Sequence, residues 1–133
     1  MECYVRLVIS SKSLTPDQIS KKLGLSHDDS WKIGETRNNT SILETDNGLI
    51  IKSKKDKNSD LETHIIYLME LTENCKNNLE DFSKIPDCSV QVACAIYYSE
   101  EPPLSLEKEI INWISSIGAS LDIDLYPIEA AQA

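Results

Sequence analysis

Hydrophobic and polar residues alternate in three separate stretches of the chain. Residues 3–10 put cysteine, valine, leucine and isoleucine on one face, and residues 89–98 and 121–126 repeat the pattern. A two-residue period is typical of a strand with one buried face. In residues 89–98 the second face carries small residues, which favours a central position in a sheet. We therefore expect three long strands.

Three other stretches show the three- and four-residue spacing of a helix with one apolar stripe. They cover residues 16–23, 61–84 and 106–117. The first has the strongest end signals: Thr15 suits an N-cap, Pro16 the first turn, and Gln18 completes a capping box. Gly24 can end this helix in the left-handed conformation. Ser59-Asp60-Leu61-Glu62 is a second capping box ahead of the long stripe, which predicts one continuous helix. Ser105 is expected to cap the last helix.

Residues 41–52 favour a hairpin with its turn at Asp46-Asn47-Gly48, because tight hairpin turns need residues that accept positive φ. Residues 26–39 are polar around Trp31, which predicts an ordered loop or a short strand that docks the indole. Trp31 and Trp113 are each the only large aromatic of their segment, so both are expected to be largely buried.

The element order β-α-β-β-α-β-α-β predicts an α+β fold with a single mixed sheet. Its first six elements match a ferredoxin-like core, here extended by one helix and one strand. Three helices should cover one face, with the last strand parallel to the fourth, and the other face should stay open. The length favours a single domain over residues 1–133, with 128–133 as a frayed tail.

The net charge of −9 is unevenly distributed. Residues 1–57 carry a balance of +2 and residues 58–133 a balance of −11. An acidic surface repels nucleic acid and anionic membranes and attracts basic partners. No apolar run approaches the ~18 residues of a membrane span, the first residues do not resemble a signal peptide, and four scattered cysteines favour free thiols. These features predict a cytoplasmic protein.

Motifs for catalysis are missing. The four glycines are isolated, so no phosphate-cradling loop is possible, and His27 and His64 have no second ligand at metal-binding spacing. We therefore expect no enzymatic activity, no cofactor and no metal. The lysine-rich residues 52–58 are interpreted as a solvated connection rather than a phosphate site.

The pair Asp122 and Asp124 is the most specific indication of a site, because both carboxylates project from one face of the last predicted strand. Three interpretations stay open: a solvated surface, a docking site for a basic partner, and metal binding or acid–base chemistry. The candidate partner-binding residues are all acidic: Asp122, Asp124, Glu100, Glu101, Glu44 and Asp46.

Several segments, in their order and spacing, resemble the bacterial domain-of-unknown-function 4279 family. They are Leu23-Gly24-Leu25, Ser30 to Glu35, the long helix, Cys88 to Tyr98, and Leu121 to Tyr126. The resemblance implies no activity and no catalytic residues. Some members resemble immunity proteins encoded beside secreted toxins.

Three function hypotheses follow. The first is an immunity-type inhibitor that neutralises a basic toxin domain encoded next to it. The second is a regulatory domain that senses a small molecule between the sheet and the basic loop. The third is an enzyme that uses Asp122 and Asp124. The sequence does not determine the oligomeric state.

Overall fold

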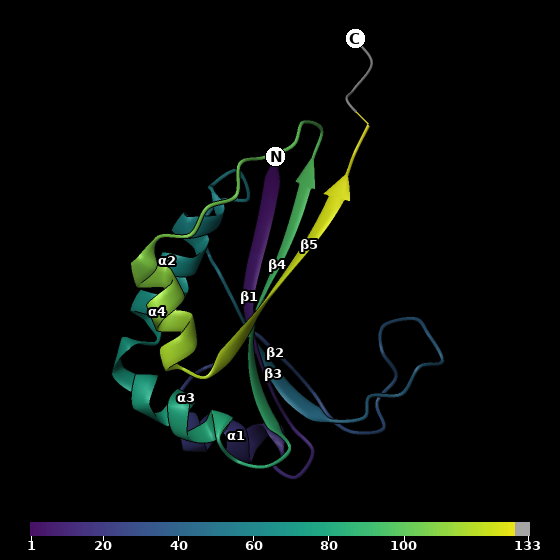
Figure 1. The fold of residues 1–133 in the computed structure, drawn as a ribbon. Helices are drawn as coiled ribbons and strands as arrows, with labels where there is room; N and C mark the ends of the chain where they lie inside the picture. The colour runs from purple at the N-terminus through teal and green to yellow at the C-terminus, as the bar shows by residue number, and fades with distance from the viewer. Residues whose placement is uncertain (130–133) are drawn as a thin grey trace.

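The computed structural model describes residues 1–129 and contains one five-stranded sheet with helices on one side (Figure 1). The strands are β1 (Glu2–Ser11), β2 (Asp29–Trp31), β3 (Asn47–Lys52), β4 (Cys88–Tyr98) and β5 (Ala119–Pro127). The helices are α1 (Pro16–Leu23), α2 (Leu61–Leu71), the short 3₁₀ helix η1 (Glu73–Cys75), α3 (Lys76–Ser83) and α4 (Lys108–Ser116). The predicted α+β class is confirmed.

The strand order is β2-β3-β1-β4-β5. β3 lies between β1 and β2 and is antiparallel to both. The two strands of the first β-α-β unit, β1 and β2, are therefore separated by β3, which belongs to the second unit. This is the split arrangement of a ferredoxin-like core. β4 is antiparallel to β1, and β5 adds to β4 in parallel. The predicted parallel pairing of the last two strands is therefore confirmed.

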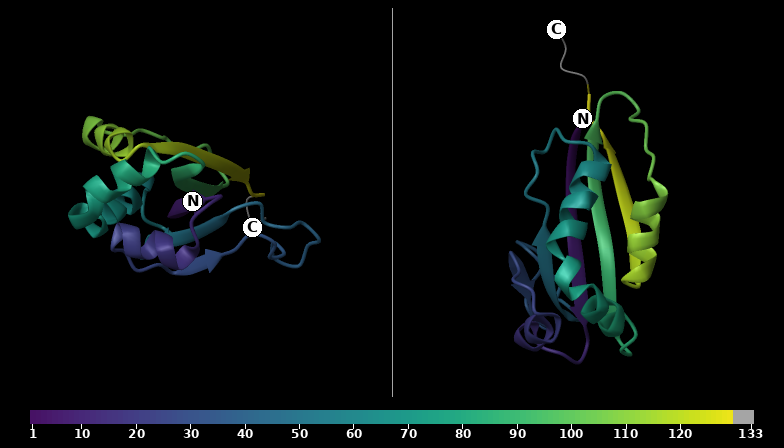
Figure 2. Two further views of the ribbon diagram at one scale, coloured as in Figure 1. Left: turned by 90° about the horizontal axis from the view of Figure 1, so that it is seen from below. Right: turned by 90° about the vertical axis from the view of Figure 1, so that its left-hand side faces the viewer.

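The helices lie on one face of the sheet, and none of residues 1–129 forms a layer over the opposite face (Figure 2). Alternate residues of the strands point into the helix layer, as their two-residue period predicts. The core between the layers includes Leu7 and Ile9 of β1, Ile96 of β4 and Phe82 of α3, all fully buried. Trp113 of α4 is 4% exposed and belongs to this core, as predicted, whereas Trp31 is only half-buried.

Helix α1 forms with the predicted end signals. The Thr15 hydroxyl accepts a hydrogen bond from the Gln18 backbone N–H, and the Gln18 side chain accepts one from the Thr15 N–H. Gly24 ends the helix at φ 71°. The cap of α2 lies one residue later than predicted, because Asp60 rather than Ser59 accepts from the Thr63 N–H. The cap predicted at Ser105 is wrong: α4 begins after Glu107 without a side-chain cap.

The predicted long helix is divided in two. Thr72 is fully buried, and its hydroxyl donates to the Leu68 carbonyl at 2.8 Å. A hydroxyl that bonds back one turn bends a helix. The chain then makes the turn η1 and continues as α3. Because the sheet twists, two shorter helices fit it better than one straight helix: α2 packs on β1, and α3 packs on β4 and α1.

The predicted hairpin over residues 41–52 is wrong. Asn47 and Gly48 belong to strand β3, whose partner in the hairpin is β2. Gly48 is needed for a close approach, because a Cβ atom there would lie 2.1 Å from the Trp31 ring. The buried Asn47 side chain donates to the Leu14 carbonyl and accepts from the Ile33 N–H, both at 2.9 Å. The Asn-Gly pair thus serves side-chain packing rather than a turn.

Residues 32–46, which connect β2 to β3, form a projecting segment that we call the arm (Figure 1). Main-chain bonds join its two sides, including Gly34 N–H to the Glu44 carbonyl at 2.9 Å and Arg37 N–H to the Ile42 carbonyl at 2.8 Å. At the other end of the chain, the Ile128 N–H donates to the Tyr98 carbonyl. The rest of the predicted frayed tail, residues 130–133, lies outside the described residues.

Candidate functional site: the open sheet face

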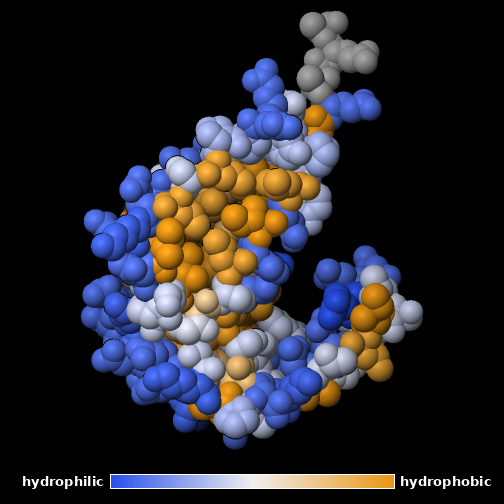
Figure 3. All heavy atoms as spheres, viewed as in Figure 1, coloured by the Kyte–Doolittle hydropathy of each residue, from blue (hydrophilic) through white to orange (hydrophobic). Residues whose placement is uncertain are grey.

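The uncovered face of the sheet is hollowed between its β5 side and the arm, as the space-filling view shows (Figure 3). Strand pairing places its side chains in rows across the sheet. One row runs Lys52, Arg6, Ala93 and Asp122 on β3, β1, β4 and β5. The two alanines of β4, Ala93 and Ala95, form a low floor between taller neighbours. We call this surface the open face.

Three tyrosines form the aromatic end of the open face. Glu2, Tyr97 and Tyr126 share one row, and Tyr4 lies in the row beside it. The Tyr97 ring stacks on the Tyr126 ring with centroids 4.8 Å apart and meets the Tyr4 ring edge-on at 5.9 Å. Tyr4 and Tyr126 are 47% and 43% exposed. The three rings thus form one continuous and accessible aromatic surface.

The Tyr4 hydroxyl donates to the Glu2 carboxylate at 2.9 Å, and Lys57 pairs with the same carboxylate at 3.2 Å. The hydrogen bond from Tyr4, followed by the contact with Lys57, lowers the pKa of Glu2. The same bond raises the pKa of Tyr4, because it stabilises the protonated phenol. At neutral pH this end of the open face therefore holds a neutral phenol beside a balanced ion pair.

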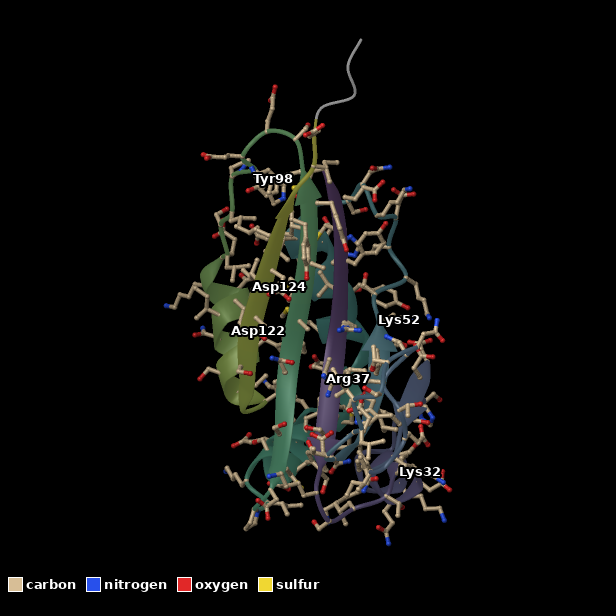
Figure 4. All side chains as sticks on the ribbon, turned by 90° about the vertical axis from the view of Figure 1, so that its right-hand side faces the viewer. Lys32, Arg37, Lys52, Tyr98, Asp122 and Asp124 are labelled. Carbon is tan, nitrogen blue, oxygen red and sulfur yellow. The ribbon has the colours of Figure 1, made fainter. Side chains whose placement is uncertain are left out.

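Asp122 and Asp124 are both exposed on the open face, as the pattern of the last strand predicts (Figure 4). Asp122 accepts a hydrogen bond from the Gln91 side chain at 2.7 Å. Among the described residues, neither aspartate takes part in an ion pair. These carboxylates are therefore free to meet a charge from outside.

The basic side chains across the open face are mostly paired within the protein. Lys52 pairs with Asp29 at 2.9 Å, Lys54 pairs with Asp28, and Arg37 in the arm pairs with Glu44 at 2.9 Å. Figure 4 shows Lys52, Arg37 and Lys32 on the side of β3 and the arm, away from the two aspartates. The side of β3 and the arm is thus largely neutralised internally, whereas Arg6 of β1 forms no ion pair among the described residues and the β5 side carries uncompensated acidic charge.

The other predicted acidic residues lie apart from the aspartate pair. Glu44 and Asp46 belong to the arm, where Glu44 binds Arg37 and Asp46 accepts a hydrogen bond from the Trp31 indole at 3.0 Å. Glu100 and Glu101 are exposed in the connection between β4 and α4. The structure therefore brings together only Asp122 and Asp124, and it engages Glu44 and Asp46 in holding the arm.

Sequence reasoning missed two parts of this surface. The first is the tyrosine group with Arg6, whose members occupy outward positions of three strands. The second is the arm, where Ile33, Ile42 and Leu43 are 51%, 53% and 56% exposed. The outward alternation was visible in each strand, but only the strand order places these residues side by side.

A shallow cavity of about 840 Å³ lies on the open face next to its aromatic end. Its lining includes Arg6, the alanine floor, the three tyrosines, Asp124 and residues of the loop that follows β3. His64 of α2 contributes to this lining and is 2% exposed. Its Nδ1 atom lies 2.7 Å from the Ser53 hydroxyl, and its Nε2 atom has no hydrogen-bond partner among the described residues. Burial lowers the pKa of His64, so the ring is neutral at neutral pH.

The cysteines lie beneath or beside this surface rather than on it. Cys3 and Cys94 point into the core from β1 and β4, and burial raises the pKa of their thiols to about 11 and about 12. Protonated thiols are poor nucleophiles. Within residues 1–129 there is also no group of three histidine, cysteine or acidic side chains placed to hold a metal ion.

The fold and this surface define a small α+β domain whose sheet has one helix-covered face and, within residues 1–129, one uncovered face. The chain belongs to the family described as domain of unknown function (DUF4279), whose model matches residues 1–127. No curated protein matches the chain, and no solved structure does. In the part that the structure describes, no helix has the length and apolar character needed to cross a bilayer.

Proposed function

We propose that this domain binds a basic protein through its open face, and that this partner is a toxin domain which the contact inactivates. The observation that carries the proposal is the joining of the exposed tyrosine group to two unpaired aspartates on a hollowed, uncovered sheet face. Tyrosine is enriched at protein interfaces and at their energetic centres, because it brings a large apolar area with a polar end.

Charge supports a basic partner. The acidic excess of the chain lies in residues 58–133, and the exposed acids of β5 belong to it. The basic side chains that face them across the sheet are largely neutralised by Asp28, Asp29 and Glu44. An incoming basic surface therefore meets attraction on β5, and Arg6 is the main source of repulsion among the described residues of the face.

The family resemblance supports the inhibitory role, since some members resemble immunity proteins encoded beside secreted toxins. Inhibition of this kind requires only that the partner's substrate groove be filled. A hollowed face with a projecting arm can do so by shape and charge, and the exposed Ile42 and Leu43 of the arm extend its apolar contact area.

The test is a pull-down and a stopped-flow titration against the product of the adjacent gene. Association should slow steeply as salt rises while dissociation changes less, because long-range attraction mainly speeds encounter. The double variant D122K/D124K should weaken binding by at least about 2 kcal/mol if the aspartates form buried pairs. Tyr97→Ala should also weaken binding, by about 2 kcal/mol if Tyr97 is a hot spot.

The control is E73K/D81K, which makes the same charge change at exposed positions on the helix side of the molecule. It should leave the dissociation rate close to that of the unchanged protein. Equal effects of the two double variants would show that only net charge matters and that the open face is not the interface. Urea unfolding curves confirm that each variant folds.

A small-molecule sensor is the second candidate, and the cavity favours it. Arg6 and Asp124 lie on either side of the alanine floor with the tyrosines beside them, a lining that suits a small zwitterion such as an amino acid. Saturable binding of a free amino acid in the same titrations, without binding of any neighbouring gene product, would contradict the toxin proposal and support the sensor.

A further inference from the structure

In the part of the chain that the structure describes, the outer edge of β5 pairs with no other strand. β5 is nine residues long, stands last in the sheet and pairs only with β4, in an unbroken register from Val90↔Ala119 to Tyr98↔Pro127. Among the described residues, no backbone or side-chain group forms a hydrogen bond to its outer side. Such an edge displays a row of N–H and C=O groups that another strand can pair with.

The two edge strands of the sheet differ in length and in the features that protect an edge from pairing. The opposite edge strand, β2, has only three residues and is followed by the arm. β5 is three times as long, has no bulge and no lysine, and reaches proline only at its last residue, Pro127. Short length, charged side chains (lysine above all), bulges and proline are the devices that protect edge strands, and before Pro127 β5 has only the charge of Asp122 and Asp124, which does not repel a basic strand. One edge is therefore closed and the other is left available.

The two faces of β5 differ in chemistry. Its open side carries Asp122 and Asp124. On its helix side Leu121 and Ile123 are half-buried, and Leu125 is 47% exposed. Ile111 of α4, the helix that packs on β5, is 53% exposed. Figure 3 shows a broad apolar area on the side of the molecule where α4 and β5 lie. The layer between helix and strand is thus open at this edge.

In the register centred on Ile123, a second copy of the chain fits this edge poorly. Two β5 strands paired antiparallel about Ile123 would set Asp122 directly opposite Asp124 of the other copy, twice over. Like charges directly opposite each other destabilise a strand pair. A strand with lysine or arginine at every second position has the opposite effect, because its basic side chains face the aspartates. The other side chains of such a strand point to the helix side of β5, where Leu121, Ile123 and Leu125 lie, so they fit there only if they are apolar.

We propose that β5 accepts an extended segment of the basic partner as a sixth strand, with lysine or arginine facing Asp122 and Asp124 and apolar side chains entering between β5 and α4. This inference rests on the proposed function, whose partner class it specifies. Main-chain hydrogen bonds supply affinity and the alternating side chains supply specificity, as in other complexes formed by strand addition.

The first test uses synthetic peptides and fluorescence anisotropy. A capped seven-residue peptide of alternating lysine and valine should bind. A peptide of the same composition with lysines and valines in separate blocks should bind at least about tenfold more weakly, because it cannot satisfy both faces of β5. An alternating glutamate–valine peptide and an alternating lysine–valine peptide with N-methylated backbone amides should not bind measurably.

Variants of the edge are compared with a matched control. D122N/D124N and Leu125→Lys should each weaken the alternating peptide at least about tenfold, the first by loss of charge pairing and the second by placing a cation on the apolar side. E73Q/D81N removes the same charge on the helix side and should change affinity less than about twofold. Leu125 is half-exposed, so its variant should fold.

Hydrogen exchange separates this inference from the proposed function. In the complex with the adjacent gene product, amides of residues 119–126 should exchange more slowly than in the free protein. A complex that forms but protects only the other strands and the arm would overturn strand addition and leave the proposed function standing. Equal affinity for the alternating and block peptides would also overturn it. Absence of any basic partner together with absence of peptide binding would overturn both.

Discussion

Gly48 shows how one residue without a side chain can fix the position of another. The Trp31 ring occupies the space where a Cβ would be, and its indole N–H is held by Asp46 at the end of the arm. The pair therefore ties the short strand β2 and the arm to β3. Gly48 has no positive φ, so conformational freedom does not explain why glycine is needed here. The reason is the absence of a side chain, which leaves room for the Trp31 ring.

Gly48→Ala should destabilise the protein by about 1–3 kcal/mol, the usual cost of overpacking, because the added methyl displaces the indole. Urea unfolding of Gly48→Ala, Trp31→Ala and the double variant measures this. In the Trp31→Ala background the glycine substitution should cost little. A cost that is the same in both backgrounds would show that the clash with Trp31 is not its cause.

His64 is a second single residue with a predictable effect: it makes the stability of the protein depend on pH. Burial holds its pKa below the ordinary value of 6.5, so the unfolded chain binds a proton more readily than the folded protein. Its contribution to stability is complete above pH 6.5 and is lost as the pH falls below that value toward the folded pKa. The loss is at most about 1.4 kcal/mol per pH unit for one proton.

His64→Asn keeps a polar atom near the Ser53 hydroxyl and removes the titration. Urea unfolding measured from pH 7.5 down to 5 should therefore give a shallower pH dependence than for the unchanged protein. The matched control is His27→Asn, which makes the same change at an exposed position. Identical slopes for the unchanged protein and His64→Asn would show that His64 is not the group responsible.

At the scale of single elements, the sequence predicts what depends on local signals. Strands β1, β4 and β5 and helix α1 are found where alternation and capping placed them. The division of the long helix was not predictable, because Thr72 continues the apolar stripe and differs from a core residue only through its hydroxyl. The hairpin was misplaced because Asn47 and Gly48 are favoured by tight turns and also by the tertiary contacts that use them here.

The apolar stripe of α4 gives an element-level prediction. Trp113→Ala should cost about 3–5 kcal/mol, because it removes a large side chain from the core. Ile111→Ala, two residues earlier on the exposed side of the same helix, should change stability by less than about 0.5 kcal/mol. Urea titration measures both. A loss of stability below about 1 kcal/mol for Trp113→Ala would contradict the packing of this side of α4 against the sheet.

At the scale of the whole molecule, the candidate site depends on strand order. The sequence shows Asp122 and Asp124 on one side of the last strand, and this part of the site was predictable. Tyr4, Tyr97 and Tyr126 are separated by long stretches of chain, and only the pairing of β1 with β4 and of β4 with β5 makes them neighbours. Register is a tertiary property, so an outward residue in one strand does not reveal its neighbour in the next.

The positions of the two tryptophans have a spectroscopic consequence. Trp113 lies in the core between α4 and the sheet, whereas Trp31 is half-buried at the base of the arm. Emission from Trp113 therefore reports whether the helix layer is packed, and emission from Trp31 reports the environment of the arm. With Trp113 replaced by phenylalanine, the protein carries a single tryptophan, beside the hollow of the open face, and its selectively excited emission can follow occupancy of that hollow without a label.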